Sequence, residues 1–212
     1  MRMRKKKNAP ERLELCGSLW VKEPCANAGR WREVFGNEAP LHIEIGCGKG
    51  GFITEIAQTN PHINYVAVEK LINVIVLAAE RVKNAGLSNV RFVLGDAALL
   101  SNMFGMGEVQ RIYLNFCDPW PKRRHEKRRL THKAFLDIYK YVLAPESSVF
   151  FKTDNRALFD YSVQSFEQCG FLLKNLTLDL HNSGIEGNIM TEYEKLFSDM
   201  GFPIYALEAV IS

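Results

Sequence analysis

Short apolar runs alternate with helical patterns from residue 41 to the C-terminus, and this alternation limits the fold more than any other feature of the sequence. The runs that predict strands are residues 41–45, 65–69, 90–94, 111–116, 149–153, 172–180 and 204–211. The segments that show helical spacing of apolar residues are about 52–59, 71–82, 97–104, 135–142 and 156–169. Strands that alternate with helices are typical of a parallel sheet with helices on both faces. Because the last two runs have little helix between them, we expect an α/β fold with seven strands, mostly parallel, and one antiparallel strand.

The chain ahead of residue 31 is less regular. Residues 1–7 contain five Lys or Arg and predict a basic arm, which either contacts nucleic acid or is a frayed terminus. After this arm, Trp20 and Trp31 suggest a segment that packs on the main body. A chain of 212 residues is long enough for one domain with a full core. We therefore expect an N-terminal arm and packed segment at residues 1–30 and a single domain at residues 31–212.

The composition limits the class of protein. No stretch approaches the roughly 20 apolar residues of a membrane span, and the basic N-terminus leads into no apolar signal-peptide core. We therefore expect a cytoplasmic protein. The five cysteines form no Cys-x-x-Cys pair, which argues against a disulfide framework or a zinc site, and we expect no metal. Cys47 and Cys117 have no adjacent base in the sequence, so neither is a strong candidate nucleophile.

Carboxylates accompany the first four expected strands. Glu44 lies near the end of the first strand and Glu69 at the end of the second, whereas Asp96 and Asp118 follow the third and fourth. Their spacings are 25, 27 and 22 residues, which is about one strand–helix unit each. In open α/β sheets, ligands bind outside the carboxyl ends of the parallel strands. The sequence therefore predicts a row of four carboxylates along a ligand-binding edge.

A glycine-rich turn, Gly46-Cys-Gly-Lys-Gly-Gly51, follows the first expected strand. It fits the dinucleotide pattern G-x-G-x-x-G and also the pattern G-x-G-x-G, and either match alone is a weak signal. Gly46 and Gly48 would let the backbone approach a ligand closely. The turn is therefore consistent with two kinds of cofactor.

The carboxylates favour S-adenosylmethionine over a nicotinamide dinucleotide. A pyrophosphate needs donors and cations, whereas S-adenosylmethionine offers a ribose diol, an adenine amino group, an ammonium and a sulfonium, which mostly favour acceptors. On this interpretation Glu44 faces the methionyl end, Glu69 takes the ribose hydroxyls and Asp96 takes the adenine amino group. The dinucleotide stays open as the alternative, because Glu69 would also suit its ribose.

Positive charge is concentrated in two segments. Residues 1–7 and 122–133 together hold twelve of the 27 Lys and Arg, whereas the rest of the chain is acidic on balance. The second segment directly follows Asp118 and a stiff Pro-Trp-Pro turn. Such segregation indicates a polyanion partner. The simplest alternative is a solvated charged surface, and a noncatalytic RNA-binding protein would explain the basic segment but not the carboxylates.

Residues 118–130, Asp-Pro-Trp-Pro-Lys-Arg-Arg-His-Glu-Lys-Arg-Arg-Leu, resemble the signature of the bacterial tRNA (guanine-N7-)-methyltransferase family. Residues 42–51, 151–156 and 187–194 resemble further signatures of that family, and the likeness extends from about Trp31 to the C-terminus. The resemblance implies a class I Rossmann-like fold and the cofactor S-adenosylmethionine. It also implies methylation of guanine at position 46, in the variable loop of tRNA.

The same resemblance implies roles for individual residues. The implied cofactor contacts are Glu44, Glu69, Asp96 and Asp118. The implied substrate contacts are Lys122, Asp154, Thr191, Glu192, Tyr193 and Glu194. The implied RNA-binding segment is Arg124, His125, Glu126, Lys127, Arg128 and Arg129. A monomer and a homodimer both stay open, and Trp120 could either stack on a base or pack the turn.

Methylation at guanine N7 makes particular demands on an enzyme. N7 carries an in-plane lone pair, so no proton has to be removed before it attacks the methyl group. The enzyme must therefore align the reactants and stabilise the positive charge that develops on the purine. We expect Asp118 to be the catalytic residue in this sense. Asp154 and Glu194 are expected to accept hydrogen bonds from guanine N1–H and the 2-amino group.

Overall fold

The structure is a computed structural model that describes residues 8–211, so the predicted basic arm at residues 1–7 lies outside the described residues. Within residues 8–211 the chain forms one seven-stranded sheet in the order β3-β2-β1-β4-β5-β7-β6. The strands are β1 Leu41–Ile45, β2 Asn64–Glu69, β3 Val90–Leu94, β4 Val109–Asn115, β5 Leu143–Thr153, β6 Phe171–Thr177 and β7 Tyr205–Ile211. β7 runs antiparallel to both β5 and β6, and the other pairs are parallel. The predicted α/β fold is confirmed.

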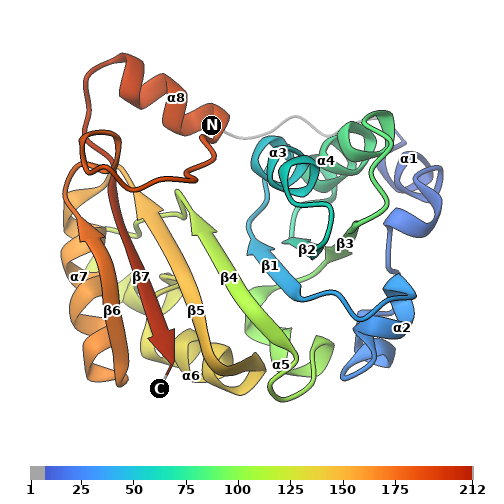
Figure 1. The fold of residues 1–212 in the computed structure, drawn as a ribbon, viewed down its shortest axis with the longest axis horizontal. Helices are drawn as coiled ribbons and strands as arrows, with labels where there is room; N and C mark the ends of the chain where they lie inside the picture. Colours follow the sequence, from blue (N-terminus) through green and yellow to red (C-terminus); the bar gives the residue numbers. More distant parts are fainter. Residues whose placement is uncertain (1–7, 212) are drawn as a thin grey trace.

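Helices cover both faces of the sheet (Figure 1). The α-helices are α1 Ala9–Glu14, α2 Trp31–Phe35, α3 Gly51–Thr59, α4 Ile72–Asn84, α5 Leu100–Met103, α6 Lys133–Val142, α7 Arg156–Gln168 and α8 Glu192–Asp199. The 3-10 helices are η1 Gly17–Leu19, η2 Pro24–Asn27, η3 Ala97–Leu99, η4 Arg123–Arg128 and η5 Leu180–Asn182. One hydrophobic cluster joins α3 and α4 to the sheet, and another joins α5, α6 and α7 to it. All of β1 is buried, as expected for a parallel strand that is covered on both faces.

The N-terminal segment packs on the sheet and on α4. The Arg12 guanidinium in α1 pairs with Glu80 in α4 at 2.6 Å. The backbone N–H of Val21 donates to the carbonyl of Phe92 in β3. Trp31 is only 1% exposed, and its indole Nε1 donates to the carbonyl of Met103 at 2.8 Å. Residues 8–35 therefore contribute to the hydrophobic core of the main body.

Several local structures differ from the sequence prediction. β5 begins at Leu143 instead of residue 149, because Leu143 pairs with Val109 before an irregularity in the ladder at which Glu146 has φ 61°. β6 ends at Thr177, three residues earlier than predicted, and the chain then turns into η5. α8 was not predicted, because its buried residue is the charged Glu194 and its apolar Leu196 is 55% exposed.

α8 lies above the carboxyl ends of β4 and β5 (Figure 1). A loop that includes residues 183–190 leads into it from η5. Within residues 8–211, no helix combines the length and the apolar character that crossing a bilayer would need.

Candidate active site

A cleft of about 580 Å³ opens at the carboxyl ends of β1, β2, β3 and β4. Glu69, Asp96 and Asp118 line it, together with Gly46 and the exposed side chain of Leu71. The sequence pattern placed Leu71 on the buried face of α4, and that placement is wrong, since Leu71 precedes the helix and lies in the cleft wall. The cleft thus combines carboxylates with an apolar wall, as a nucleoside ligand requires.

Glu44, near the end of β1, is 2% exposed and is not part of the lining of the cleft, so three of the four predicted carboxylates meet there. Its Oε1 accepts a hydrogen bond of 3.1 Å from Asn115 Nδ2 in the neighbouring strand β4. Its Oε2 is buried without a hydrogen-bond partner among residues 8–211. Burial raises the pKa of Glu44 to about 7, against the hydrogen bond from Asn115. A buried oxygen of this kind suits a donor or a cation supplied by a ligand.

The glycine turn adopts backbone conformations that few other residues tolerate. Gly46 and Gly48 have φ of 78° and 56°, and the N–H of Gly46 donates to Val68 at 2.8 Å. At Gly50, an added Cβ would lie 2.7 Å from the Cβ of Ala78 in α4. The turn therefore keeps the backbone close to both the cleft and α4.

Backbone N–H groups fix the orientation of two carboxylates in the cleft. Glu69 Oε1 accepts from the N–H of Leu71 at 3.0 Å, and Asp96 Oδ1 accepts from the N–H of Ala98 at 2.9 Å. The second bond also caps η3. Both side chains are thus held in the cleft before any ligand arrives.

Asp118 is exposed and sits in a turn with unusual backbone geometry. Phe116 and Trp120, on either side of it, have φ of 51° and 42°, in a region that bulky residues seldom occupy. Arg129 holds the turn, donating 3.2 Å hydrogen bonds from Nε to the carbonyl of Pro119 and from Nη2 to that of Trp120. Strained backbone of this kind concentrates at functional sites.

The predicted RNA-binding segment forms η4 at the rim of the cleft. Lys127 and Arg128 line the cleft, and the Arg128 guanidinium lies 4.8 Å from the centroid of the Trp120 ring. His125 packs edge-on against the same ring at 5.6 Å. The exposed basic side chains of this region are Lys122, Arg123, Arg124, Lys127 and Arg128. In contrast, Arg129 turns inward over the ring of Tyr161, and burial together with the nearby Glu126 carboxylate raises the pKa of Tyr161.

The segment 191–194 enters the site from α8. The Tyr193 ring lies 5.1 Å from that of Phe116, which lines the cleft, and partial burial and the neighbouring Asp154 carboxylate raise the pKa of Tyr193. Thr191 and Glu194 form a capping box at the start of α8. Glu192 is exposed and pairs with Arg81 at 2.5 Å.

Glu194 is fully buried, unlike the other three residues of this segment. Its carboxylate pairs with Lys152 Nζ at 2.5 Å and accepts a hydrogen bond from Asn188 Nδ2 at 2.7 Å. The predicted contact between Glu194 and guanine stays a prediction, and in this structure the carboxylate is occupied by protein donors.

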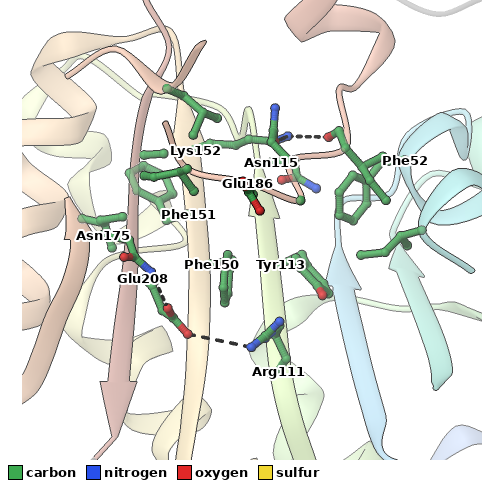
Figure 2. Close-up of a pocket in the computed structure, with 18 residues that line it drawn as sticks. Phe52, Arg111, Tyr113, Asn115, Phe150, Phe151, Lys152, Asn175, Glu186 and Glu208 are labelled. Carbon is green, nitrogen blue, oxygen red and sulfur yellow. Dashed lines mark hydrogen bonds and ion pairs between the residues drawn. The ribbon is translucent and has the colours of Figure 1, made fainter. Parts of the chain in front are cut away.

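A smaller cavity, of about 120 Å³, lies between the loop at 185–189 and the strands β4, β5 and β7 (Figure 2). Asn115 lines both this cavity and the larger cleft. Figure 2 shows Arg111, Glu208 and Asn175 linked in a row at the far end of the cavity, where Asn175 Nδ2 donates to Glu208 at 3.0 Å. Across residues 8–211, no group of three or more His, Cys, Asp or Glu is arranged to hold a metal ion.

Comparison with known proteins gives the family. A family model described as "Putative methyltransferase" matches residues 38–207. The tRNA (guanine-N(7)-)-methyltransferase of Listeria monocytogenes is 52% identical over 209 residues, which cover 99% of this chain and 98% of that protein. The enzyme of the same name from Bacillus velezensis is 51% identical over 208 residues, covering 98% and 96%. This chain belongs to the tRNA (guanine-N(7)-)-methyltransferase family.

Solved structures of other methyltransferases share the fold of this family member. The 16S rRNA methyltransferase KamB superposes with a TM-score of 0.64 at 15% identity, over 87% of this chain and 93% of that one. A SAM-dependent methyltransferase from Aquifex aeolicus superposes with a TM-score of 0.59 at 14% identity, over 98% and 100%. The predicted Rossmann-like methyltransferase fold is confirmed.

The sequence analysis assigned no role to three residues that the structure of this methyltransferase places at the site. Asn115 bonds Glu44, Phe116 lines the cleft, and Lys152 pairs with Glu194. The sequence holds a signal for Lys152, because this charged residue directly follows the apolar residues Val149, Phe150 and Phe151 in a predicted strand. It holds no signal for Asn115 or Phe116. The role of Asn115 depends on the pairing of its strand with β1, and that of Phe116 on its backbone angles.

Proposed function

We propose that this chain transfers the methyl group of S-adenosylmethionine to N7 of guanine 46 in the variable loop of tRNA. The observation that carries the proposal is that Glu69, Asp96 and Asp118 share one cleft with the cations Lys127 and Arg128. Carboxylates suit the sulfonium nucleoside, and cations at the rim suit RNA phosphates. The relatives named tRNA (guanine-N(7)-)-methyltransferase support the same activity.

The residues of the cleft fit S-adenosylmethionine. The unpartnered Oε2 of Glu44 suits a cationic or donor group at the methionyl end, and Glu69 suits the ribose hydroxyls. Asp96 suits the adenine amino group, while Gly46 and Gly48 keep the backbone free of side chains at the turn. When bound, the cofactor supplies an electrophilic methyl group. The three carboxylates that line the cleft would repel a pyrophosphate, which disfavours the dinucleotide alternative.

The protein would promote methyl transfer by aligning guanine N7 with the methyl group and by stabilising the positive charge that develops on the purine. Asp118 is exposed in the cleft, where its carboxylate would stabilise the positive charge that develops on the purine as N7 attacks. Asp154 would accept hydrogen bonds from guanine N1–H and the 2-amino group. Lys122 and the segment 191–194 complete the substrate side. Phe116 and Tyr193 give this side an aromatic surface on which a base leaving its tertiary contacts could stack.

The exposed cations of η4 would hold the RNA backbone. Arg124, Lys127 and Arg128 are exposed, and His125 lies beside them against Trp120. We assign Trp120 to packing of the turn, since it contacts both His125 and Arg128. We also propose a cytoplasmic location, where the tRNA substrate is found, and a catalytic domain that spans residues 31–212 behind the arm and packed segment of residues 1–30.

The decisive experiment combines the protein with methyl-labelled S-adenosylmethionine and unmodified tRNA, followed by analysis of the nucleosides. We expect label in 7-methylguanosine, and none when the transcript carries adenine in place of guanine 46. Label in another nucleoside, or none in the wild-type transcript, would refute the proposal.

Substitution of Asp118 tests the role that we assign to its carboxylate. Asp118→Ala removes the carboxylate at the reaction centre, so methyl transfer should be lost, whereas the fold should persist because the side chain is exposed and buries no core surface. Methyl transfer is measured with labelled cofactor, and folding by thermal unfolding. A wild-type rate in this variant would exclude the assigned role.

A further inference from the structure

Lys152 and Glu194 form a buried ion pair, and Lys152 has no role in the reaction described above. Their charged atoms are 2.5 Å apart, and the two side chains are 8% and 0% exposed. Lys152 lies near the carboxyl end of β5, whereas Glu194 belongs to the first turn of α8, 42 residues further along the chain. The pair therefore joins the sheet to the substrate-side segment.

Further hydrogen bonds converge on this pair from the same segment. Lys152 Nζ donates to Asn188 Oδ1 at 2.9 Å and to the carbonyl of Ile189 at 2.7 Å, so its three donors are all used. Glu194 accepts from Asn188 Nδ2 at 2.7 Å and from the N–H of Thr191 at 3.3 Å. His181 Nε2 lies 3.4 Å from the same carboxylate. The whole stretch from Asn188 to Glu194 is thus fastened to β5 through two side chains.

The pair also adjoins the elements that surround the reaction centre. In the sheet, Lys152 of β5 pairs with Asn115 of β4, the residue whose side chain donates to Glu44. The backbone carbonyl of Lys152 accepts a hydrogen bond from the N–H of Phe116. Figure 2 shows Lys152 and Asn115 on neighbouring strands, β5 and β4, at the loop. On the other side of the pair, Tyr193 precedes Glu194 and contacts the ring of Phe116. A shift of this ion pair would therefore move Tyr193 relative to the cleft.

A buried ion pair by itself adds little to the free energy of unfolding. The desolvation of both charges offsets much of their attraction, and apolar residues of similar volume often stabilise a protein as well or better. Removing one partner is more damaging, because it leaves an uncompensated buried charge. The location of this pair beside the reaction centre thus points to a role in geometry.

We propose that Lys152 and Glu194 are positioning residues that hold the segment 188–194 at the cleft, and that Glu194 acts on the reaction through Lys152 instead of contacting guanine. The inference rests on the proposed methylation of guanine. It assigns the reading of the guanine edge to Asp154, and to Glu194 the placement of Tyr193 and Thr191. Both residues of the pair therefore belong to one functional unit.

A double-mutant cycle tests whether the two residues act as a unit. Lys152→Met and Glu194→Gln are each expected to lower kcat/KM for tRNA by roughly 100-fold, as a displaced substrate-side segment would. The variant that carries both substitutions is expected to lie within about threefold of the weaker single variant. Lys195→Met, which removes an exposed lysine from the same helix, is the matched control and should keep the wild-type rate. Losses that multiply in the double variant would overturn the proposal.

A base analogue tests whether Glu194 reads guanine. Inosine keeps N7 and N1–H but lacks the 2-amino group, so a transcript with inosine at the target position weakens any contact to that edge. We expect the ratio of kcat/KM for guanine over inosine to be the same in wild type and in Glu194→Gln. A ratio that falls toward one in Glu194→Gln would show direct recognition and overturn the proposal.

Two controls distinguish failure of this proposal from unfolding of a variant and from failure of the proposed function. Binding of S-adenosylhomocysteine establishes that each variant is folded. If Lys152→Met does not fold, the inosine comparison in Glu194→Gln alone decides, because glutamine keeps the shape of the side chain. Failure of the proposed function would instead appear as wild-type protein that forms no 7-methylguanosine.

Discussion

Glu44 is buried at the end of β1, and Asn115 occupies only one of its carboxylate oxygens. The other oxygen lacks a partner within residues 8–211, and burial holds the pKa near 7. In the free protein the side chain is therefore neutral below pH 7 and charged above it. A cationic ligand selects the charged form, so binding and ionisation of Glu44 are linked.

This linkage predicts a pH dependence of ligand affinity. S-adenosylhomocysteine keeps the ammonium of the cofactor, and its affinity should rise as the pH increases from 6 to 8, by up to about tenfold per pH unit on the acid side. Calorimetry at pH 6.5 in two buffers of different ionisation enthalpy should show that binding releases a proton. Glu44→Gln should bind more weakly and should lose the proton release. A wild-type affinity that does not vary over this range would contradict the assignment of Glu44 to the methionyl end.

We also predict that removal of the Glu44 carboxylate stabilises the folded protein. Because its pKa is raised in the folded state, the folded protein binds the proton more tightly than the unfolded chain does. The contribution of Glu44 to the free energy of unfolding therefore falls as the pH rises from about 4.5 to about 7. Glu44→Gln avoids this loss and should be more stable than wild type at pH 8, by up to roughly 3 kcal/mol.

Denaturant unfolding at pH 4.5 and pH 8 measures this difference, which should be present only at the higher pH. Glu55→Gln, at an exposed position of α3, is the matched control for the change of side chain. A variant less stable than wild type at pH 8 would count against a costly charge at Glu44.

At the scale of elements, the turn at 116–121 and η4 form one unit in which arginines have different roles. Arg124 and Arg128 are exposed, whereas Arg129 donates to the carbonyls of Pro119 and Trp120 and covers Tyr161. All three belong to the RNA-binding segment that the family resemblance implies. The geometry separates them into cations available to RNA and one that braces the turn carrying Asp118.

Salt dependence distinguishes the two kinds of arginine. Arg124→Gln should weaken tRNA binding and reduce the slope of log affinity against log salt by about one, as for the loss of one phosphate contact. Arg129→Gln removes the charge and the two-pronged donor that holds the turn, so it should lower kcat, but it should leave the slope unchanged because Arg129 lies over Tyr161 and not on RNA. Filter binding between 50 and 200 mM salt (a range chosen for this sensitivity) measures the slope. An equal flattening in both variants would indicate that Arg129 also contacts phosphate.

Over the whole molecule, packing is uneven. Large hydrophobic clusters fill both faces of the sheet, whereas the part that carries η5 and α8 rests on a small cluster around Leu180, Ile204 and Ala206. Residues with few buried apolar contacts open locally at lower free energy than the core does. The segment from Leu180 to Ile204 should therefore exchange its amide hydrogens faster than β1 and β4.

Hydrogen exchange followed by mass spectrometry tests this prediction on the free protein, and tRNA should slow exchange in the same segment. Equal protection of this segment and the central strands would mean that the Lys152–Glu194 pair fixes it as firmly as the core.

The sequence predicted the parts of this molecule that depend on local pattern. The apolar runs at 41–45 and 90–94 match β1 and β3, and the carboxylates Glu69 and Asp96 lie in the cleft because Glu69 ends β2 and Asp96 lies two residues after the end of β3. α8 escaped prediction because its buried position is a charged residue, Glu194. That position makes sense only with Lys152, and sequence periodicity does not reveal partners so distant along the chain.

Backbone angles were equally hidden. Phe116 and Trp120 adopt positive φ although neither residue type suggests it, because the Arg129 side chain and the pairing of β4 with β5 hold the turn. The inward orientation of Arg129 was likewise invisible in a run of similar basic residues. The pattern of apolar residues and carboxylates therefore predicted the sheet and most of the cleft. Which charged side chains face inward depends on contacts between residues far apart in the sequence.

The unpartnered oxygen of Glu44 has a consequence for the protein in the cell. A ligand that binds the folded state and supplies the missing partner of a buried carboxylate oxygen stabilises the protein against unfolding, and therefore against proteolysis, more strongly when the ligand is abundant. The half-life of this enzyme would then follow the supply of methyl donor. Starvation for methionine would reduce not only the rate of tRNA modification but also the amount of catalyst available to resume it.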